Sequence, residues 1–247
     1  MQAVIYIAHG TRVQEGIDEA RAFVERAKKY IPIALQEICF LELVEPTIQE
    51  TIERCIQKGA SEIALVPILL FTANHAKKDI PAIVKPIERK YPHIVFSYGK
   101  PFGIHPNLIE QINERIEEKT PKLAPDAEIL LIGRGSSDPA VVRDFAEIAT
   151  HFKLRYGIRH VEIAFLYGNG PKFSNFVERL VQSPNRPRYI VPYLLFQGRL
   201  RKHIEKELEG FQLVTVCNSL GYGDRVLDVL LERTREAIKA LRTSYAS

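Results

Sequence analysis

The chain has 247 residues with a net charge of +4, and its 46% hydrophobic and 26% charged residues are typical of a globular protein with one large or two smaller domains. No apolar run approaches the ~20 residues of a membrane-spanning helix and no secretory signal precedes the first strand, so we expect a cytoplasmic protein without a membrane partner. The mild positive charge permits an anionic small molecule, but no basic run is interleaved with aromatic residues, so we expect no nucleic acid partner.

Strand-like and helix-like segments alternate along the first half. Residues 4–8 form a short, wholly apolar run, which is typical of a strand buried on both faces, and residues 17–27 carry apolar side chains at helical spacing. Asp79 is a plausible N-cap for a helix that begins near Pro81. The other strands of this half are predicted at 37–43, 62–70 and 94–99, and the other helices from Pro46 to Gly59 and over 108–116.

Residues 119–127 are polar and contain prolines, which indicates a linker between an N-terminal catalytic lobe, residues 1–118, and a C-terminal lobe, residues 128–247. The C-terminal lobe repeats the same alternation. Its strands are predicted at 128–133, 161–167, 189–196 and 213–218, and its helices around 141–148, after Pro171, around 204–208 and over 225–242. Apolar strands that alternate with helices predict an α/β fold of two tandem doubly wound parallel-sheet lobes, with strand order 2-1-3-4 and a cleft between the lobes.

An internal duplication at an offset of 125 residues relates the two lobes. The segments that repeat most clearly are 4–10 with 129–135 and 66–71 with 191–196. At this offset His9 falls on Arg134, and His75 falls on Leu200. The pattern indicates one active lobe and one supporting lobe, and we expect the supporting lobe to form the opposite wall of the cleft.

Both of these histidines lie at predicted strand ends, where doubly wound sheets bind their ligands. His9 directly follows the first strand and His75 lies in the loop that leaves the third, so both imidazoles are expected to face one site. Glu42 closes the second strand at the same edge, and Glu45 lies in the loop beyond it. Two histidines and a carboxylate can hold a divalent transition metal and leave positions open for a substrate. A lone histidine at such a place would more simply be a polar loop residue. The metal-site interpretation depends on there being two such histidines, His9 and His75, both of which the second half lacks.

Other motifs exclude several kinds of site. Gly10 and Gly135 each permit a tight turn after a strand, but neither belongs to a complete dinucleotide or P-loop motif, so nucleotide binding is not indicated. Cys39, Cys55 and Cys217 form no CxxC pair and lie in apolar surroundings. They are predicted to be buried small side chains rather than disulfides, metal ligands or ligands of an iron–sulfur centre.

Basic residues gather at or near the predicted strand ends. Each alone is more simply a solvated charge, but as a group they could line a cleft for a polyanion. They are Arg12, Lys77, Lys78, Arg134, Arg199, Arg201 and Lys202. His105, in the loop after the fourth strand, is expected to have a surface or structural role.

Several motifs stand in a distinctive order: HG at 9–10, FLE and EPTI within 40–48, VPILLFTANHAKKDIP at 66–81, SYGKPFG at 97–103 and IGRGSSDP at 132–139. This combination resembles the sirohydrochlorin chelatases, the class II chelatases of sirohaem and cobalamin synthesis, and is most similar to their bacillus-type ferrochelatases. The resemblance covers nearly the whole chain, including the duplication. No single motif is diagnostic, but their order and combination are specific.

The resemblance implies a lyase-type chelatase that inserts a divalent metal into a tetrapyrrole without an organic cofactor. It implies that His9 and His75 bind the metal and accept protons, and that either Glu42 or Glu45 supplies an acidic contact. Cobalt-inserting relatives of this length often carry a histidine-rich segment and a cysteine-bearing tail, and because this chain has neither, we expect a sirohydrochlorin ferrochelatase that uses Fe²⁺, with Co²⁺ insertion as the alternative. The residues expected to contact sirohydrochlorin are Glu45, Leu70, Phe71, Thr72, Ala73, Asn74 and Arg134.

The sequence leaves two alternative functions to consider. A two-lobed carrier that binds a tetrapyrrole or a metal without catalysis would have the same sequence features. A phosphoryl-transfer enzyme with a histidine after the first strand is disfavoured, because the histidine phosphatases need an arginine just before that histidine, where this chain has Ala8. We expect the protein to be a monomer.

Overall fold

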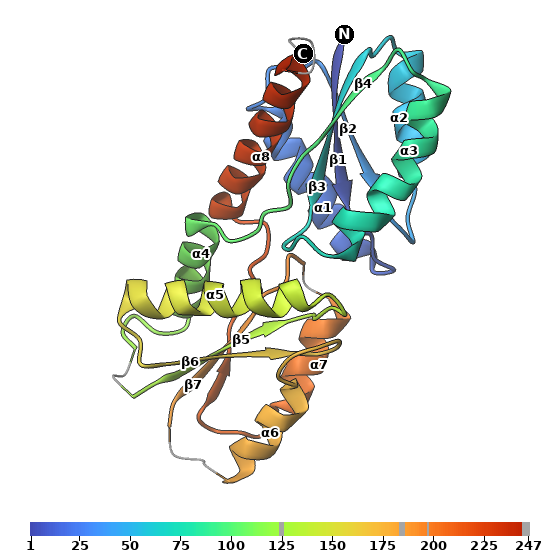
Figure 1. The fold of residues 1–247 in the computed structure, drawn as a ribbon. Helices are drawn as coiled ribbons and strands as arrows, with labels where there is room; N and C mark the ends of the chain where they lie inside the picture. Colours follow the sequence, from blue (N-terminus) through green and yellow to red (C-terminus); the bar gives the residue numbers. More distant parts are fainter. Residues whose placement is uncertain (124–125, 183–185, 197, 244–247) are drawn as a thin grey trace. The chain divides into compact units, whose positions relative to one another are not determined.

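The computed structural model describes residues 1–123, 126–182, 186–196 and 198–243 (Figure 1). Contacts between residues divide the chain into two compact units. The first unit comprises Met1–Gly103 and a segment that begins at Leu227, and the second comprises Ile104–Val226. The expected linker, 119–127, therefore falls within the second unit, and its residues 124 and 125 lie outside the described residues.

The first unit is built on a parallel sheet in the order β2-β1-β3-β4, as the sequence predicts. The two central strands are buried along nearly their whole length, because helices cover both faces of the sheet (Figure 1). The strands are β1 (Gln2–Ala8), β2 (Leu35–Phe40), β3 (Glu62–Ile68) and β4 (Val95–Tyr98). The helices are α1 (Gln14–Lys28), α2 (Ile48–Gln57), the π-helix η1 (His75–Asp79) and α3 (Ile80–Lys90).

Strand β2 ends at Phe40, three residues earlier than predicted. The strand cannot reach the predicted end at Leu43, because the backbone of Leu43 is left-handed with a φ of 68°, a conformation that a regular strand does not contain. The amide of Glu42 still donates to the carbonyl oxygen of His9 at 3.2 Å, so the loop stays attached to the end of β1. Glu42 is therefore a loop residue beside His9 rather than the last residue of a strand.

Helix α2 begins at Ile48, two residues later than the predicted start at Pro46. Thr47 caps the helix, because its side chain accepts from the amide of Glu50 at 3.3 Å, and the carboxylate of Glu50 accepts from the amide of Thr47 at 2.8 Å. This reciprocal capping box satisfies two amides that the helix itself leaves unpaired, and so sets its first turn.

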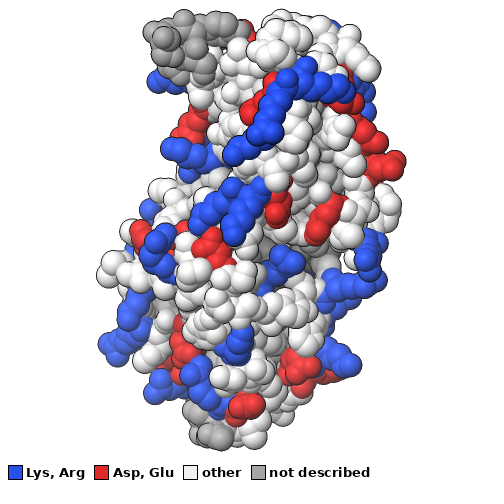
Figure 2. All heavy atoms as spheres, turned by 45° about the vertical axis from the view of Figure 1, so that its right-hand side comes forward, with Lys and Arg blue, Asp and Glu red and all other residues white. Residues whose placement is uncertain are grey.

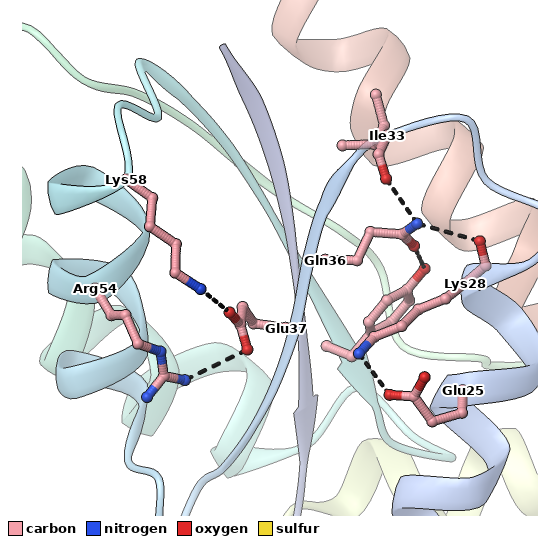
Figure 3. A network of polar contacts seen from close by, with 8 residues as sticks. Glu25, Lys28, Ile33, Gln36, Glu37, Arg54 and Lys58 are labelled. Carbon is pink, nitrogen blue, oxygen red and sulfur yellow. Dashed lines mark hydrogen bonds and ion pairs between the residues drawn. The ribbon is translucent and has the colours of Figure 1, made fainter.

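Polar side chains tie the edge strand β2 to helices on both faces of the sheet (Figure 3). The carboxylate of Glu37 lies 2.8 Å from the ammonium of Lys58 and 3.5 Å from the guanidinium of Arg54, on the side of α2. Burial raises the pKa of Glu37, but the hydrogen bond from Lys58 and the nearby positive charges outweigh it, so the net pKa is below the usual value. On the opposite face Gln36 accepts from the hydroxyl of Tyr6 at 3.0 Å. It donates to the carbonyl oxygen of Lys28 at the end of α1 and to that of Ile33 in the loop before β2.

The second unit repeats this architecture, with a parallel sheet in the order β6-β5-β7-β8. The predicted fold class, two doubly wound parallel α/β units, is confirmed. Its strands are β5 (Glu128–Gly133), β6 (His160–Phe165), β7 (Arg188–Pro192) and β8 (Val214–Val216). Its helices are α4 (Pro106–Glu117), α5 (Pro139–Tyr156), α6 (Phe173–Gln182) and α7 (Arg199–Glu207).

The last helix of each half belongs to the unit of the other half. Helix α4 follows β4 in the chain, but it contacts α5 and β7 in the second unit. From Leu227 onward, α8 (Asp224–Thr243) belongs to the first unit, where the carbonyl oxygen of Ala237 accepts from the hydroxyl of Ser97 on β4 at 2.8 Å. The compact units therefore differ from the lobes 1–118 and 128–247 that chain order predicts, because each sheet is completed by a helix from the other half.

The structure also shows the state of the three cysteines and the character of the helices. In the described part of the chain Cys39, Cys55 and Cys217 are free and buried, as predicted. Burial raises the pKa of all three thiols, to about 11 for Cys55 and about 12 for Cys217, which keeps them protonated at neutral pH. Of the helices that the structure describes, none has the length and apolar character needed to cross a membrane.

Candidate metal site

His9 lies at the point where the chain leaves the carboxyl end of β1. Gly10 permits this turn, because its φ is +95° and a Cβ at this position would overlap the carbonyl oxygen of Glu42. His9 Nδ1 lies 3.1 Å from the carbonyl oxygen of Gly10 and 3.5 Å from Oε1 of Glu42. Both partners are acceptors, so we assign the proton of the neutral ring to Nδ1, which leaves a lone pair on Nε2.

His75 is the first residue of η1, in the segment that follows β3. Its Nδ1 lies 2.8 Å from Oδ2 of Asp79 at the other end of the same π-helix. Asp79 occupies the predicted N-cap position of α3, but its backbone is itself helical and its side chain makes no capping hydrogen bond. The carboxylate accepts the Nδ1 proton of His75 instead, so the Nε2 of this ring also carries a lone pair. Short π-helical turns are frequent at functional sites.

The structure brings His9 and His75, hereafter the histidine pair, into direct contact. Their Nε2 atoms are 3.2 Å apart, and their rings are perpendicular. Because both Nδ1 protons are donated elsewhere, two lone pairs face each other, an arrangement that a shared proton or a cation between them stabilises. Two nitrogens that bind one ion tetrahedrally at about 2.0–2.1 Å are about 3.3–3.4 Å apart, so the spacing fits one shared metal ion. Side-chain exposures of 24% and 30% give an ion access from solvent.

Glu42 and Glu45 are separated by the structure. The carboxylate of Glu42 adjoins Nδ1 of His9, across the ring from Nε2, so it supports the ring and does not add the third ligand that the sequence suggested. Glu45 is exposed, and its main-chain carbonyl accepts from Arg21 at 3.4 Å. Among the described residues no group of three or more His, Cys, Asp or Glu side chains is arranged to hold a metal. The histidine pair could thus supply two ligands and would leave the other positions on an ion open.

The predicted substrate contacts of the first unit lie between β3 and η1. Leu70, Phe71, Ala73 and Asn74 are half-buried and Thr72 is exposed. This segment leads directly into His75, so its apolar side chains adjoin the metal site in the chain. Apolar walls with a few polar groups are typical of small-molecule sites.

The predicted basic group is divided between the two units. Lys77 and Lys78 are exposed on η1, next to His75, whereas Arg134 is exposed after β5 in the second unit. On the face drawn in Figure 2, basic and acidic side chains are interleaved rather than gathered in one basic stripe. His105 has a structural role, as expected, because its ring caps α4 by accepting from the amide of Asn107 at 3.1 Å.

Every polar residue of the site is replaced in the duplicate. At positions 125 residues later, His9, Glu42, His75 and Asp79 are matched by Arg134, Tyr167, Leu200 and Ile204. The backbone of the turn is kept, since Gly135 has a φ of +93° and a Cβ there would overlap the carbonyl oxygen of Tyr167. Sequence reasoning missed Asp79 as a site residue. Its spacing of four residues from His75 and its absence from the duplicate were the signals that could have found it.

Asp79→Ala should weaken the binding of divalent cobalt by about 10- to 100-fold, because His75 loses the acceptor that fixes its tautomer and its ring orientation. Cobalt binding to the protein can be followed by visible absorption. Glu147→Ala is a matched control, because Glu147 forms an exposed pair with His151 at 3.5 Å, also four residues apart, on α5. Equal cobalt affinity in both variants would show that Asp79 does not support the ligand.

The comparisons with known proteins cover both halves of the chain. The CbiX family matches residues 3–119 and again 128–237, two matches that start 125 residues apart. The chain is 39% identical to the sirohydrochlorin ferrochelatase of Priestia megaterium, over 99% of this chain and 94% of that relative. It is 31% identical to the sirohydrochlorin cobaltochelatase of the same organism, over 97% and 81% of the two chains.

Solved structures of the same kind of protein have a similar fold. SirB from Bacillus subtilis, solved with Fe³⁺, superimposes with a TM-score of 0.89 at 39% identity, covering 96% of this chain and 95% of SirB. Because the family matches both halves and the relatives are similar over nearly the full length, this chain belongs to the CbiX family, that of the sirohydrochlorin chelatases.

Proposed function

We propose that this protein is a sirohydrochlorin ferrochelatase, which inserts Fe²⁺ into sirohydrochlorin to form sirohaem. The observation that carries the proposal is the histidine pair, whose Nε2 atoms lie 3.2 Å apart while each Nδ1 atom lies beside an acceptor oxygen. Membership of the CbiX family and the 39% identity to a ferrochelatase over nearly the whole chain support the choice of reaction.

The chemistry requires that the ion lose water and that the macrocycle lose two pyrrole protons as the metal–nitrogen bonds form. The histidine pair presents the ion with open positions, which pyrrole nitrogens can fill in place of water. As the ion leaves, each Nε2 becomes free to accept a pyrrole proton, and imidazole has a suitable affinity for protons near neutral pH. Glu42, 3.5 Å from Nδ1 of His9, stabilises the imidazolium that results. We therefore choose Glu42 over Glu45 as the acidic catalytic residue.

The remaining site residues are assigned from their places in the fold. We propose that Leu70–Asn74 contact the macrocycle, because this segment adjoins His75 and exposes part of its apolar surface. We propose that exposed cations, among them Arg134, bind carboxylates of the anionic substrate, and that Glu45 makes a polar contact at its edge. Three free, buried cysteines fit a reducing compartment such as the cytoplasm, and we expect a monomer.

Iron is favoured over cobalt, since the ferrochelatase relative is 39% identical and the cobaltochelatase relative 31%. The test is to mix the protein with sirohydrochlorin and either Fe²⁺ or Co²⁺ without air and to follow the absorption of the macrocycle. We expect many turnovers, with a higher kcat/KM for Fe²⁺. A faster reaction with Co²⁺ would reassign the metal, and stoichiometric binding without turnover would reassign the protein as a carrier.

A further inference from the structure

Helix α8 is the helix of the second half that belongs to the first unit, hereafter the exchanged helix. One of its arginines binds the turn that follows β4. The guanidinium of Arg233 donates to the carbonyl oxygen of Pro101 at 3.2 Å and to that of Phe102 at 3.0 Å. Its side chain is only 13% exposed, and its charge is balanced by Glu232 and Glu236, each 3.1 Å away. An almost buried arginine that satisfies two carbonyl oxygens fixes the position of the turn on α8.

The same turn holds the beginning of the segment that leads to the metal site. The amide of Phe102 donates to the carbonyl oxygen of Leu69, and that of Gly103 to the carbonyl oxygen of Leu70, both at 2.9 Å. Phe102 is fully buried, which anchors the turn in the core of the first unit. Five residues after Leu70 the chain reaches His75. A continuous set of hydrogen bonds therefore runs from Arg233, through this turn, to the start of the loop that carries His75.

The second unit contains a similar arrangement, in which the arginine binds one carbonyl oxygen rather than two and no histidine follows. Arg115 on α4, 118 residues before Arg233, donates to the carbonyl oxygen of Leu220 at 2.9 Å and pairs with Glu118, three residues later. The amide of Leu220 donates to a carbonyl group at the end of β7 at 3.2 Å, and the segment beyond β7 leads to Leu200, the counterpart of His75. The chain thus has one arginine contact that leads to a metal ligand and one that leads to a leucine.

We propose that Arg233 is a positioning residue of the metal site: by holding the Pro101–Gly103 turn, it fixes the loop that sets the distance of His75 from His9. The inference rests on the proposed function, since it assigns a role in metal insertion to a residue outside the site. It also gives the helix exchange a functional meaning, because the metal ligands of the first half depend on a helix of the second half.

The test compares Arg233→Met with Arg115→Met in the full-length protein. Methionine keeps much of the apolar stem and removes the donors in both variants, so both should lower the melting temperature. Only Arg233→Met should also raise the dissociation constant for Co²⁺ by about tenfold and change its visible spectrum, because the ligand spacing is altered. At a temperature well below both melting transitions, its kcat for metal insertion should fall by about tenfold or more, since small displacements at a reacting centre have effects of this size.

Arg233→Lys supplies the second arm, because lysine retains a cationic donor that can reach one of the two carbonyl oxygens. It should recover part of the Co²⁺ affinity and part of kcat. If Arg233→Met matches Arg115→Met in the Co²⁺ spectrum, in affinity and in kcat, Arg233 is only structural and the inference is wrong. Wild-type protein that fails to bind Co²⁺, or binds it without inserting metal, would instead contradict the proposed function, so the two failures are distinguishable.

Discussion

His9→Ala will lower the rate of metal insertion into sirohydrochlorin by at least about 100-fold, the scale on which a positioned acid–base group acts. In the proposed mechanism the change removes one of two protein ligands and one of two proton acceptors, and it leaves His75 Nε2 without its neighbour at 3.2 Å. Stability should change much less than activity, because the His9 side chain is partly exposed to solvent. The measurement is the anaerobic initial rate with Fe²⁺, together with the thermal melting curve of the variant.

His93→Ala is the matched control for this prediction. His93 is exposed in the same unit, in the turn before β4, and contacts the ring of Tyr91 edge-on at 6.4 Å between centroids. Its removal should leave both the rate and the metal affinity unchanged. Insertion by His9→Ala at a rate near that of the wild type would refute the catalytic assignment of the histidine pair, whatever the control does.

The position of the histidine pair could be predicted from sequence because two independent patterns agree on it. Parallel strands share a carboxyl edge, so residues that follow β1 and β3 must come close. The duplicate then shows which strand-end residues the fold itself does not require, since Arg134 and Leu200 occupy the same places. The fold class followed from the alternation of apolar strands with helices, and the strand order followed from the order usual in doubly wound sheets.

The role of Asp79 could not be read from local propensity. An aspartate before an apolar, proline-containing helix is a good N-cap candidate, and the π-helical turn that brings it to His75 has no sequence signal of its own. The sequence also does not predict that α4 and α8 each pack in the unit of the other half, for a related reason. The apolar face of α4 predicts that the helix packs on a sheet, but both sheets of a duplicated fold offer similar surfaces, and chain order does not choose between them.

Gly10→Ala will destabilise the protein by about 2–5 kcal/mol and will also weaken metal binding. A left-handed conformation costs an L-residue about 1–2 kcal/mol, and the overlap of a Cβ with the carbonyl oxygen of Glu42 adds about 1–3 kcal/mol of overpacking. The carbonyl carbon of Glu42 would lie only 3.1 Å from the new Cβ, so backbone rather than a flexible side chain has to move. Urea unfolding and Co²⁺ titration measure the two effects.

Two other glycines separate the causes. Gly59 has a φ of +90°, and no atom lies within 4 Å of the position that a Cβ would take, so Gly59→Ala should show the conformational cost alone, about 1–2 kcal/mol. Gly135→Ala should be about as destabilising as Gly10→Ala, because its Cβ would overlap Tyr167 at the same point of the duplicated turn. It should nevertheless leave Co²⁺ affinity unchanged, because that turn presents Arg134 in place of a metal ligand. Equal loss of Co²⁺ affinity in Gly10→Ala and Gly135→Ala would mean that the metal does not bind where β1 ends. A loss confined to Gly10→Ala would tie the ligand geometry to the one turn whose glycine lets His9 and Glu42 approach each other.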